Sequence, residues 1–206
     1  MPSKLTGVGR KLKWSDFPLL KQPPAGETAE AATTWSITDK GFATNLRKLD
    51  TSAGKPVFQW LDDFHVEIQF VPAKSYRVTQ VDAKTPAAKG WLLAHEQGHF
   101  DIAALLTRDF YYTVLALTRK RYDKESAARS DYIDAANEIL ERIPFLQDQY
   151  DDETGHSLNR AKQWAWLDAI DRARELHRQP LQKAPDGTLL RVTMIDALKQ
   201  ASIVSG

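Results

Sequence analysis

The sequence predicts an α+β fold in which a small N-terminal β-sheet packs on a core of three helices. Two observations lead to this prediction. β-Branched and aromatic residues are concentrated before residue 80, as is typical of strands. From residue 86 onward, apolar residues recur at helical intervals. A chain of 206 residues suits one domain with a sizeable core. We therefore expect one domain over residues 1–206, with residues 1–30 and 179–206 as candidates for appended segments.

Four stretches of the N-terminal part are expected to be strands, namely residues 33–38, 57–60, 65–70 and 76–78. In the third stretch polar residues alternate with Val66, Ile68 and Phe70, so one face should be buried and the other solvated. That alternation makes His65 a residue of the strand surface rather than a metal ligand. The simplest arrangement is one sheet of three or four strands with an edge near the first helix.

Three helices are expected after residue 84. The first should begin at Thr85, a good N-cap residue, because Pro86 follows it at the first helical position. No further proline interrupts this helix before about Lys120. The second covers residues 123–142 and is ended or kinked by Pro144. Residues 150–157 indicate a polar loop, and the third helix runs from 158 to about 178. In the tail we expect a strand at 189–194 and a short helix at 195–201.

Composition excludes several classes of function. The chain has 28 basic and 27 acidic residues, and no basic tract is interleaved with aromatic residues, so nucleic-acid binding is not expected. The first twenty residues contain no uninterrupted apolar run, so we expect no signal peptide and no membrane association, and either a cytoplasmic location or export without a conventional leader. There is no cysteine, so a bound metal would need histidine and carboxylate ligands.

The first predicted helix carries the pattern His-Glu-x-x-His at His95, Glu96 and His99. A spacing of four residues on a helix places both imidazoles on one face, one turn apart. Two imidazole nitrogens held in this way can bind one Zn²⁺ at about 2.0–2.1 Å each. The intervening glutamate can then act as the base that removes a proton from water. The alternative is a solvated or core histidine pair, but a chance match would rarely fall in a capped amphipathic helix.

A catalytic zinc site needs a third protein ligand. His156 is the leading candidate from the residues alone, because it lies in the polar loop directly before a helix. A glutamate of the second helix is the alternative, and Glu125, Glu138 and Glu141 are available. Leu105 stands where some metalloproteases have a third histidine, six residues after the second. Asp101 points to another face of the helix.

Three segments resemble a bacterial family of predicted secreted zinc-dependent proteases that is catalogued as a domain of unknown function. They are HEQGHFDI at 95–102, LKWSDF at 12–17 and YDDETGH at 150–156. The resemblance implies a zincin-like metallopeptidase domain, with zinc on His95, His99 and His156 and Glu96 as general base. It also implies a secreted or periplasmic location. The family commonly has glycine after the last histidine, where this chain has Ser157.

The function expected from these residues is hydrolysis of peptide bonds in a peptide or protein by zinc-activated water. A group that stabilises the developing oxyanion is also needed. Tyr150 is the leading candidate for that role and His177 the alternative. Asp101, Asp151 or Glu153 could accept hydrogen bonds from the metal-binding imidazoles. The competing functions are a cell-wall peptide amidase and a non-catalytic, zinc-containing binding or toxin-like interaction module.

Overall fold

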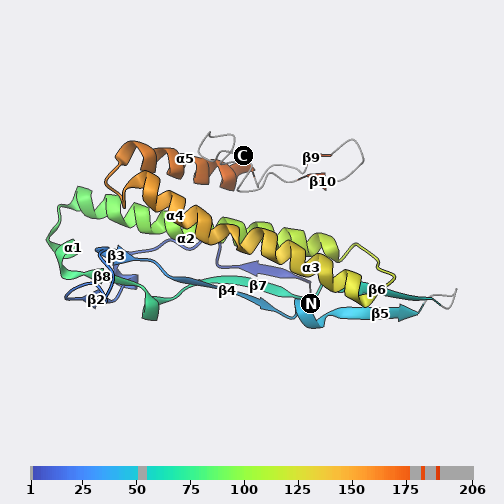
Figure 1. The fold of residues 1–206 in the computed structure, drawn as a ribbon. Helices are drawn as coiled ribbons and strands as arrows, with labels where there is room; N and C mark the ends of the chain where they lie inside the picture. The colour runs from blue at the N-terminus through green and yellow to red at the C-terminus, as the bar shows by residue number, and fades with distance from the viewer. Residues whose placement is uncertain (1, 51–54, 177–181, 184–188, 191–206) are drawn as a thin grey trace.

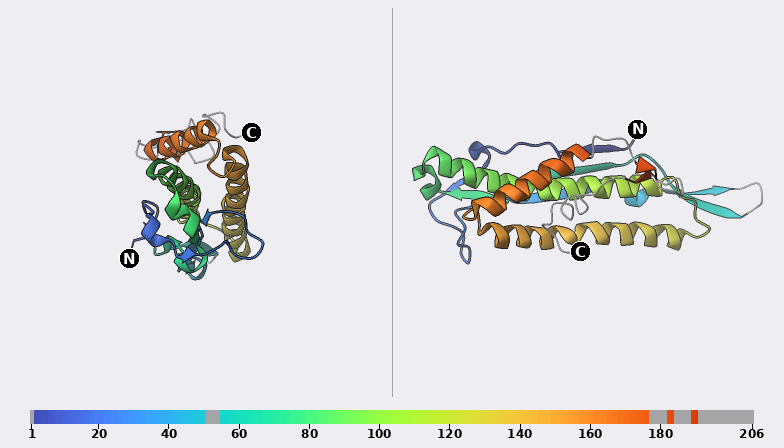
Figure 2. Two further views of the ribbon diagram at one scale, coloured as in Figure 1. Left: turned by 90° about the vertical axis from the view of Figure 1, so that its left-hand side faces the viewer. Right: turned by 90° about the horizontal axis from the view of Figure 1, so that it is seen from above.

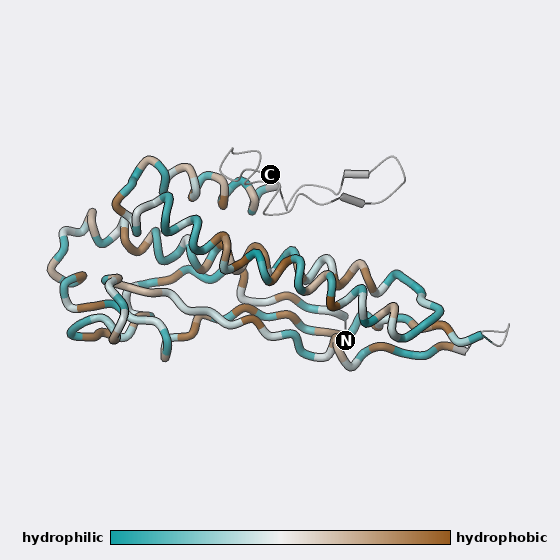
Figure 3. The backbone as a smooth tube through the Cα atoms, in the orientation of Figure 1, coloured by the Kyte–Doolittle hydropathy of each residue, from teal (hydrophilic) through white to brown (hydrophobic). Residues whose placement is uncertain are grey.

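The computed structural model describes residues 2–50, 55–176, 182–183 and 189–190. Within them the fold is α+β, with the helices forming one layer and the strands β1 to β8 (residues 4–78) the other (Figure 1). Both layers carry hydrophobic stretches (Figure 3). None of the described helices combines the length and apolar character needed to cross a bilayer.

The main sheet has three strands in the order β1-β7-β4: β1 (Lys4–Thr6), β7 (His65–Phe70) and β4 (Trp35–Lys40). β1 is parallel to β7, and β4 is antiparallel to it. The alternation predicted for β7 is confirmed, because Val66, Ile68 and Phe70 are buried and the residues between them are not. The buried side chains Ile68 and Phe70 belong to the same hydrophobic cluster as Phe100 of the longest helix.

The prediction of a single sheet is wrong for the described residues. A second three-stranded sheet has the order β2-β8-β3, from β2 (Leu19–Leu20), β8 (Tyr76–Val78) and β3 (Ala31–Ala32). β5 (Leu46–Asp50) and β6 (Pro56–Trp60) form a separate antiparallel pair. The 3-10 turn Pro72–Lys74 separates β7 from β8, since proline cannot continue a strand ladder.

The helix α2 (Pro86–Leu117) organises the helical layer. Its predicted start is confirmed, because the Thr85 side chain accepts a hydrogen bond from the backbone N–H of Ala88. Every residue from 100 to 111 is buried, since α3 (Glu125–Leu140), α4 (Arg142–Thr154), α5 (Arg160–Leu176) and β7 all pack on this helix. The short helix α1 (Thr79–Ala83) leads into it, and Figure 2 shows α2 from two further directions.

The polar loop expected at residues 150–157 is mostly helix, and the predicted three helices are therefore too few. α4 continues to Thr154 and ends at Gly155, which is left-handed with φ 54°. Pro144 lies in the first turn of α4, where no intrahelical bond to its nitrogen is required. The helical stripe that the prediction missed consists of Ile143, Leu146, Tyr150 and Thr154.

Little of the tail is described. β9 (Gln182–Lys183) and β10 (Leu189–Leu190) form an antiparallel pair. The expected strand at 189–194 is described only at its first two residues, and the expected helix at 195–201 lies outside the described residues.

Candidate metal centre

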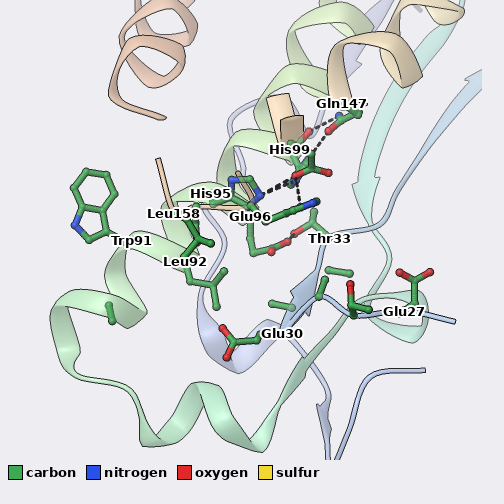
Figure 4. Close-up of a pocket in the computed structure, with 18 of the residues that line it drawn as sticks. Glu27, Glu30, Thr33, Trp91, Leu92, His95, Glu96, His99, Gln147 and Leu158 are labelled. Carbon is green, nitrogen blue, oxygen red and sulfur yellow. Dashed lines mark hydrogen bonds and ion pairs between the residues drawn. The ribbon is translucent and has the colours of Figure 1, made fainter. Parts of the chain in front are cut away.

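The two histidines of the motif lie on one face of α2, as the spacing predicts. Their Nε2 atoms are 3.1 Å apart, and the face that carries them is turned toward α4 (Figure 4). His95 is buried, with 2% of its surface exposed. The two nitrogens are therefore close enough to share one ion at ordinary metal–nitrogen distances.

Both imidazoles are anchored through their other ring nitrogen. Gln147 of α4 donates its amide N–H to the backbone carbonyl of His99, at 2.8 Å, and this fixes which end of the amide is oxygen. That oxygen accepts from Nδ1 of His99. Thr154 donates its hydroxyl to the carbonyl of Tyr150 at 2.6 Å, so its oxygen is left to accept from Nδ1 of His95 at 3.4 Å. With Nδ1 engaged in these contacts, Nε2 is the nitrogen of each ring that could bind a metal in place of a proton.

Asp151 of α4 supplies the third group at this point. Its Oδ1 lies 3.0 Å from Nε2 of His95 and 3.0 Å from Nε2 of His99. The donor atoms of these three residues all lie within 4.8 Å of one another, so the set could hold a metal ion. Nδ1 of His156 is 3.2 Å from the same carboxylate oxygen, on a side chain that is 70% exposed. The structure thus brings His156 next to the centre through Asp151.

The electrostatics of the centre favour positive charge between these groups. Burial acts to raise the pKa of Asp151, but hydrogen bonds with His95 and His99 outweigh it and hold that pKa well below its usual range. Burial lowers the pKa of His95. Burial also acts to lower the pKa of His99, but its hydrogen bond to Asp151 and the negative charges of Glu96 and Asp151 raise it. A cation at this point would find an ionised carboxylate and fixed imidazoles.

Glu96 lies beside the two histidines and lines the same cleft. Its side chain is buried, and its Oε2 accepts a hydrogen bond from the Thr33 hydroxyl at 2.7 Å. Thr33 directly follows β3, so a residue next to the second sheet orients the carboxylate. Figure 4 shows Thr33, Glu96, His95 and His99 facing one another.

The other residues of the motif join α2 to its neighbours. Gln97 accepts a hydrogen bond from the backbone N–H of Leu12, at 2.7 Å, and donates to the carbonyl of Arg10. It also donates to Asp101, which is buried and forms an ion pair with Arg174. Burial raises the pKa of Asp101. The idea that Asp101 supports a metal ligand is therefore wrong: it connects α2 with α5.

Gly98 is required by the close approach of Tyr150. A Cβ on Gly98 would lie 2.3 Å from the Tyr150 Oη and 2.6 Å from its Cζ. The Tyr150 ring is fully buried and stacks on His95, with centroids 4.7 Å apart and an interplanar angle of 17°. The loop position predicted for Tyr150 is wrong. Its place is behind the imidazoles, outside the lining of the cleft, so the predicted oxyanion role has no support from its position.

The remaining candidates have other partners. Glu153 accepts hydrogen bonds from Trp166 and Gln149, and does not reach the histidines. Glu125 and Glu138 form exposed ion pairs with Arg129 and Arg142. The Nε2 of His65 is 2.7 Å from the Thr6 hydroxyl, as suits a strand-surface residue. His177 lies outside the described residues.

A cleft of about 840 Å³ opens over the centre. Its walls come from α2, from the segment 27–33 that includes β3, and from the turn 156–160 that joins α4 to α5. His95, Glu96, His99, Asp151 and His156 all line it. The groups that could bind a metal and the group that could act as a base therefore face one solvent-accessible space.

Comparison with known proteins gives one match. Residues 65–157 match the model of a family that is described as a bacterial protein of unknown function (DUF922). The match begins with β7 and ends just after α4, so it includes the HEQGHFDI and YDDETGH segments and omits the LKWSDF segment. Comparisons with curated proteins and with solved structures gave no match.

Proposed function

We propose that this protein is a zinc-dependent peptidase of zincin type. The observation that supports this most directly is the convergence of the His95 and His99 Nε2 atoms, 3.1 Å apart, with Glu96 beside them in one cleft. A metal site with only a structural role does not require a carboxylate that lines the cleft beside the metal ligands.

The residues present fit a zinc ion. Two imidazoles and one carboxylate, without any thiolate, form a common ligand set for catalytic zinc and leave a coordination position open. His95, His99 and Asp151 would hold the ion. The position of Asp151 supports its assignment as third ligand, whereas the family resemblance implies His156. A zinc ion bound there would supply the Lewis acid that polarises a carbonyl group and acidifies water.

Glu96 would act as general base and then as general acid. In this proposal its carboxylate takes a proton from the water that attacks the scissile carbonyl carbon, and gives it to the nitrogen of the leaving amine. The hydrogen bond from Thr33 occupies one carboxylate oxygen and leaves the other for this transfer. If Asp151 is the third ligand, the imidazolium form of His156 would keep Nδ1 on the Asp151 carboxylate and donate from Nε2 to the carbonyl oxygen as it becomes negative.

The edge of the second sheet supports a peptide substrate. β3 is an edge strand, and the backbone N–H of Val78 in β8 donates to the carbonyl of Glu30. Because facing directions alternate along a strand, the backbone groups of Ala31 are directed away from β8. Ala31 lines the cleft, so an extended peptide could pair with this edge beside Glu96.

The proposal is tested by metal removal. The protein should cleave a broad library of peptides, lose that activity on dialysis against a chelator, and regain it with one equivalent of zinc. Cleavage is read by mass spectrometry and zinc by elemental analysis. Zinc bound without any cleavage would favour the non-catalytic interaction module instead.

A second prediction separates the two candidates for third ligand. Asp151→Ala should weaken zinc binding by more than about 100-fold, because it removes a direct ligand, whereas loss of an outer partner typically costs 10–100-fold. His156→Ala, which removes a neighbour of Asp151 rather than a ligand, should lose at most about 10–100-fold in zinc affinity, and its kcat should fall. Competition with a chromophoric chelator measures the affinities. If His156→Ala loses more zinc affinity than Asp151→Ala, the assignment implied by the family resemblance is right.

A further inference from the structure

The cleft has an apolar wall with one strongly exposed residue. Leu158, in the turn before α5, is 86% exposed, and Trp91 and Leu92 of α2 lie on the same side of the cleft. Trp91 is held edge-on by Trp164, with centroids 5.3 Å apart at 90°, and Trp164 is itself 61% exposed. Exposed apolar groups gathered at a concave site are typical of ligand binding.

Two further residues of α5 contact Trp91 in the apolar wall. The guanidinium of Arg160 lies over the Trp91 ring, 5.5 Å from its centroid. Gln163 of α5 is buried and donates its side-chain amide to the backbone carbonyl of Trp91 at 3.0 Å. Trp91 is therefore fixed by contacts from α5 while it lines the cleft, which reduces the entropy lost when a ligand packs on it.

The segment before β3 forms another wall of the cleft and brings two carboxylates to it, those of Glu27 and Glu30. Glu30 forms an ion pair with Lys84 at 2.8 Å. Glu27 is exposed and has no ion pair with any residue in the described part of the chain. In Figure 4 Trp91 and Leu158 lie on one side of His95 and Glu96, and Glu27 lies on the other.

We propose that the cleft selects peptides that carry a bulky apolar side chain on one side of the metal centre and a basic side chain on the other. The apolar side chain packs on Trp91 and Leu158, and the basic one faces Glu27. This inference rests on the proposed peptidase function, because it takes the bound peptide to cross the centre between the two walls. It names a substrate class that the ligand set alone does not define.

Binding to the full-length, zinc-loaded Glu96→Gln protein provides a test that does not depend on turnover. Fluorescent peptides in three forms are compared: one with phenylalanine and lysine on opposite sides of a central amide, one with alanine for phenylalanine, and one with glutamate for lysine. The first should bind at least about 10-fold more tightly than either of the others, as expected for loss of one buried anchor.

Variants assign each preference to its wall. Trp91→Ala should remove the preference for phenylalanine, and Glu27→Lys should remove or reverse the preference for lysine over glutamate. Phe145→Ala and Glu125→Lys are matched controls, since both residues are exposed and neither lines the cleft. These controls should keep both preferences. Thermal unfolding confirms that each variant is folded.

The outcomes separate this inference from the proposed function. Cleavage without either preference, or preferences that survive both Trp91→Ala and Glu27→Lys, would overturn the inference and leave the peptidase proposal standing. Selective binding by the variant together with no cleavage by wild type would overturn the peptidase proposal and show a peptide-binding cleft with the stated preferences. If none of the three peptides binds, the inference is wrong.

Discussion

Glu96→Gln should reduce kcat for peptide cleavage by at least about 1,000-fold, within the range of 10²–10⁴ that a positioned general base contributes. Glutamine has nearly the same shape, so it can keep the hydrogen bond from the Thr33 hydroxyl to the side-chain oxygen. It cannot take a proton from water. Because Glu96 is not one of the three groups that converge on the metal position, zinc affinity should stay near that of wild type.

Two measurements are needed for this variant, namely kcat under saturating substrate and the zinc content of the same sample. Glu125→Gln is the matched control, since Glu125 lies on an exposed face of α3 in an ion pair with Arg129. It should keep full activity. If Glu96→Gln retains activity within about tenfold of wild type, Glu96 is not the base. If it loses zinc, the separation of ligand and base proposed for this centre is wrong.

Gly98→Ala should destabilise the helical core, although it adds only one methyl group. The added Cβ would lie 2.3 Å from the Tyr150 hydroxyl and 2.6 Å from its ring, and that ring is fully buried against His95. Overpacking of this kind costs about 1–3 kcal/mol, and the greater helix propensity of alanine returns no more than about 1 kcal/mol. We expect a net loss of about 2 kcal/mol in the free energy of unfolding, and a displaced His95 ring.

Gly90→Ala is the control for this change, because both glycines lie in α2 and a Cβ on Gly90 would meet no atom within 4 Å. It should raise the free energy of unfolding by about 0.5–1 kcal/mol. Urea denaturation of the metal-free proteins compares the two variants. The double variant Gly98→Ala/Tyr150→Leu should be less unstable than the sum of its single changes, because the clash is gone. A stable Gly98→Ala protein would contradict the packing described here.

The sequence patterns predicted correctly those elements whose bounds depend only on neighbouring residues. The bounds of β7 and β8 and the capped start of α2 follow from alternation, from Pro72 and from Thr85-Pro86. The number of sheets depends on pairing between distant strands, such as β1 with β7, and no local pattern determines that pairing. The helix α4 was missed because the acidic run at residues 151–153 obscured a stripe of buried residues with helical spacing.

In the candidate site, too, local spacing was predictable and contacts between distant segments were not. The spacing of His95 and His99 predicted that their rings share a face, and this is confirmed. The groups that orient them, Gln147 and Thr154, have no signal of their own, because ordinary polar residues gain this role only when α4 packs against α2. In a helix over residues 142–154, the spacing of Gln147, Asp151 and Thr154 places all three on one face, so the missing signal is that of the helix itself.

The proposed metal ligands and the groups that orient them come from two helices. His95 and His99 come from α2, whereas Gln147, Asp151 and Thr154 come from α4, which reaches α2 only after the chain has passed through α3. An ion bound here would tie together segments some fifty residues apart in sequence, Asp151 lying 56 residues after His95. An ion that binds only the folded state raises the free energy of unfolding. At concentrations above Kd, this increase grows with the logarithm of the ion concentration. Metal supply would therefore set the equilibrium stability of the folded protein as well as its chemistry.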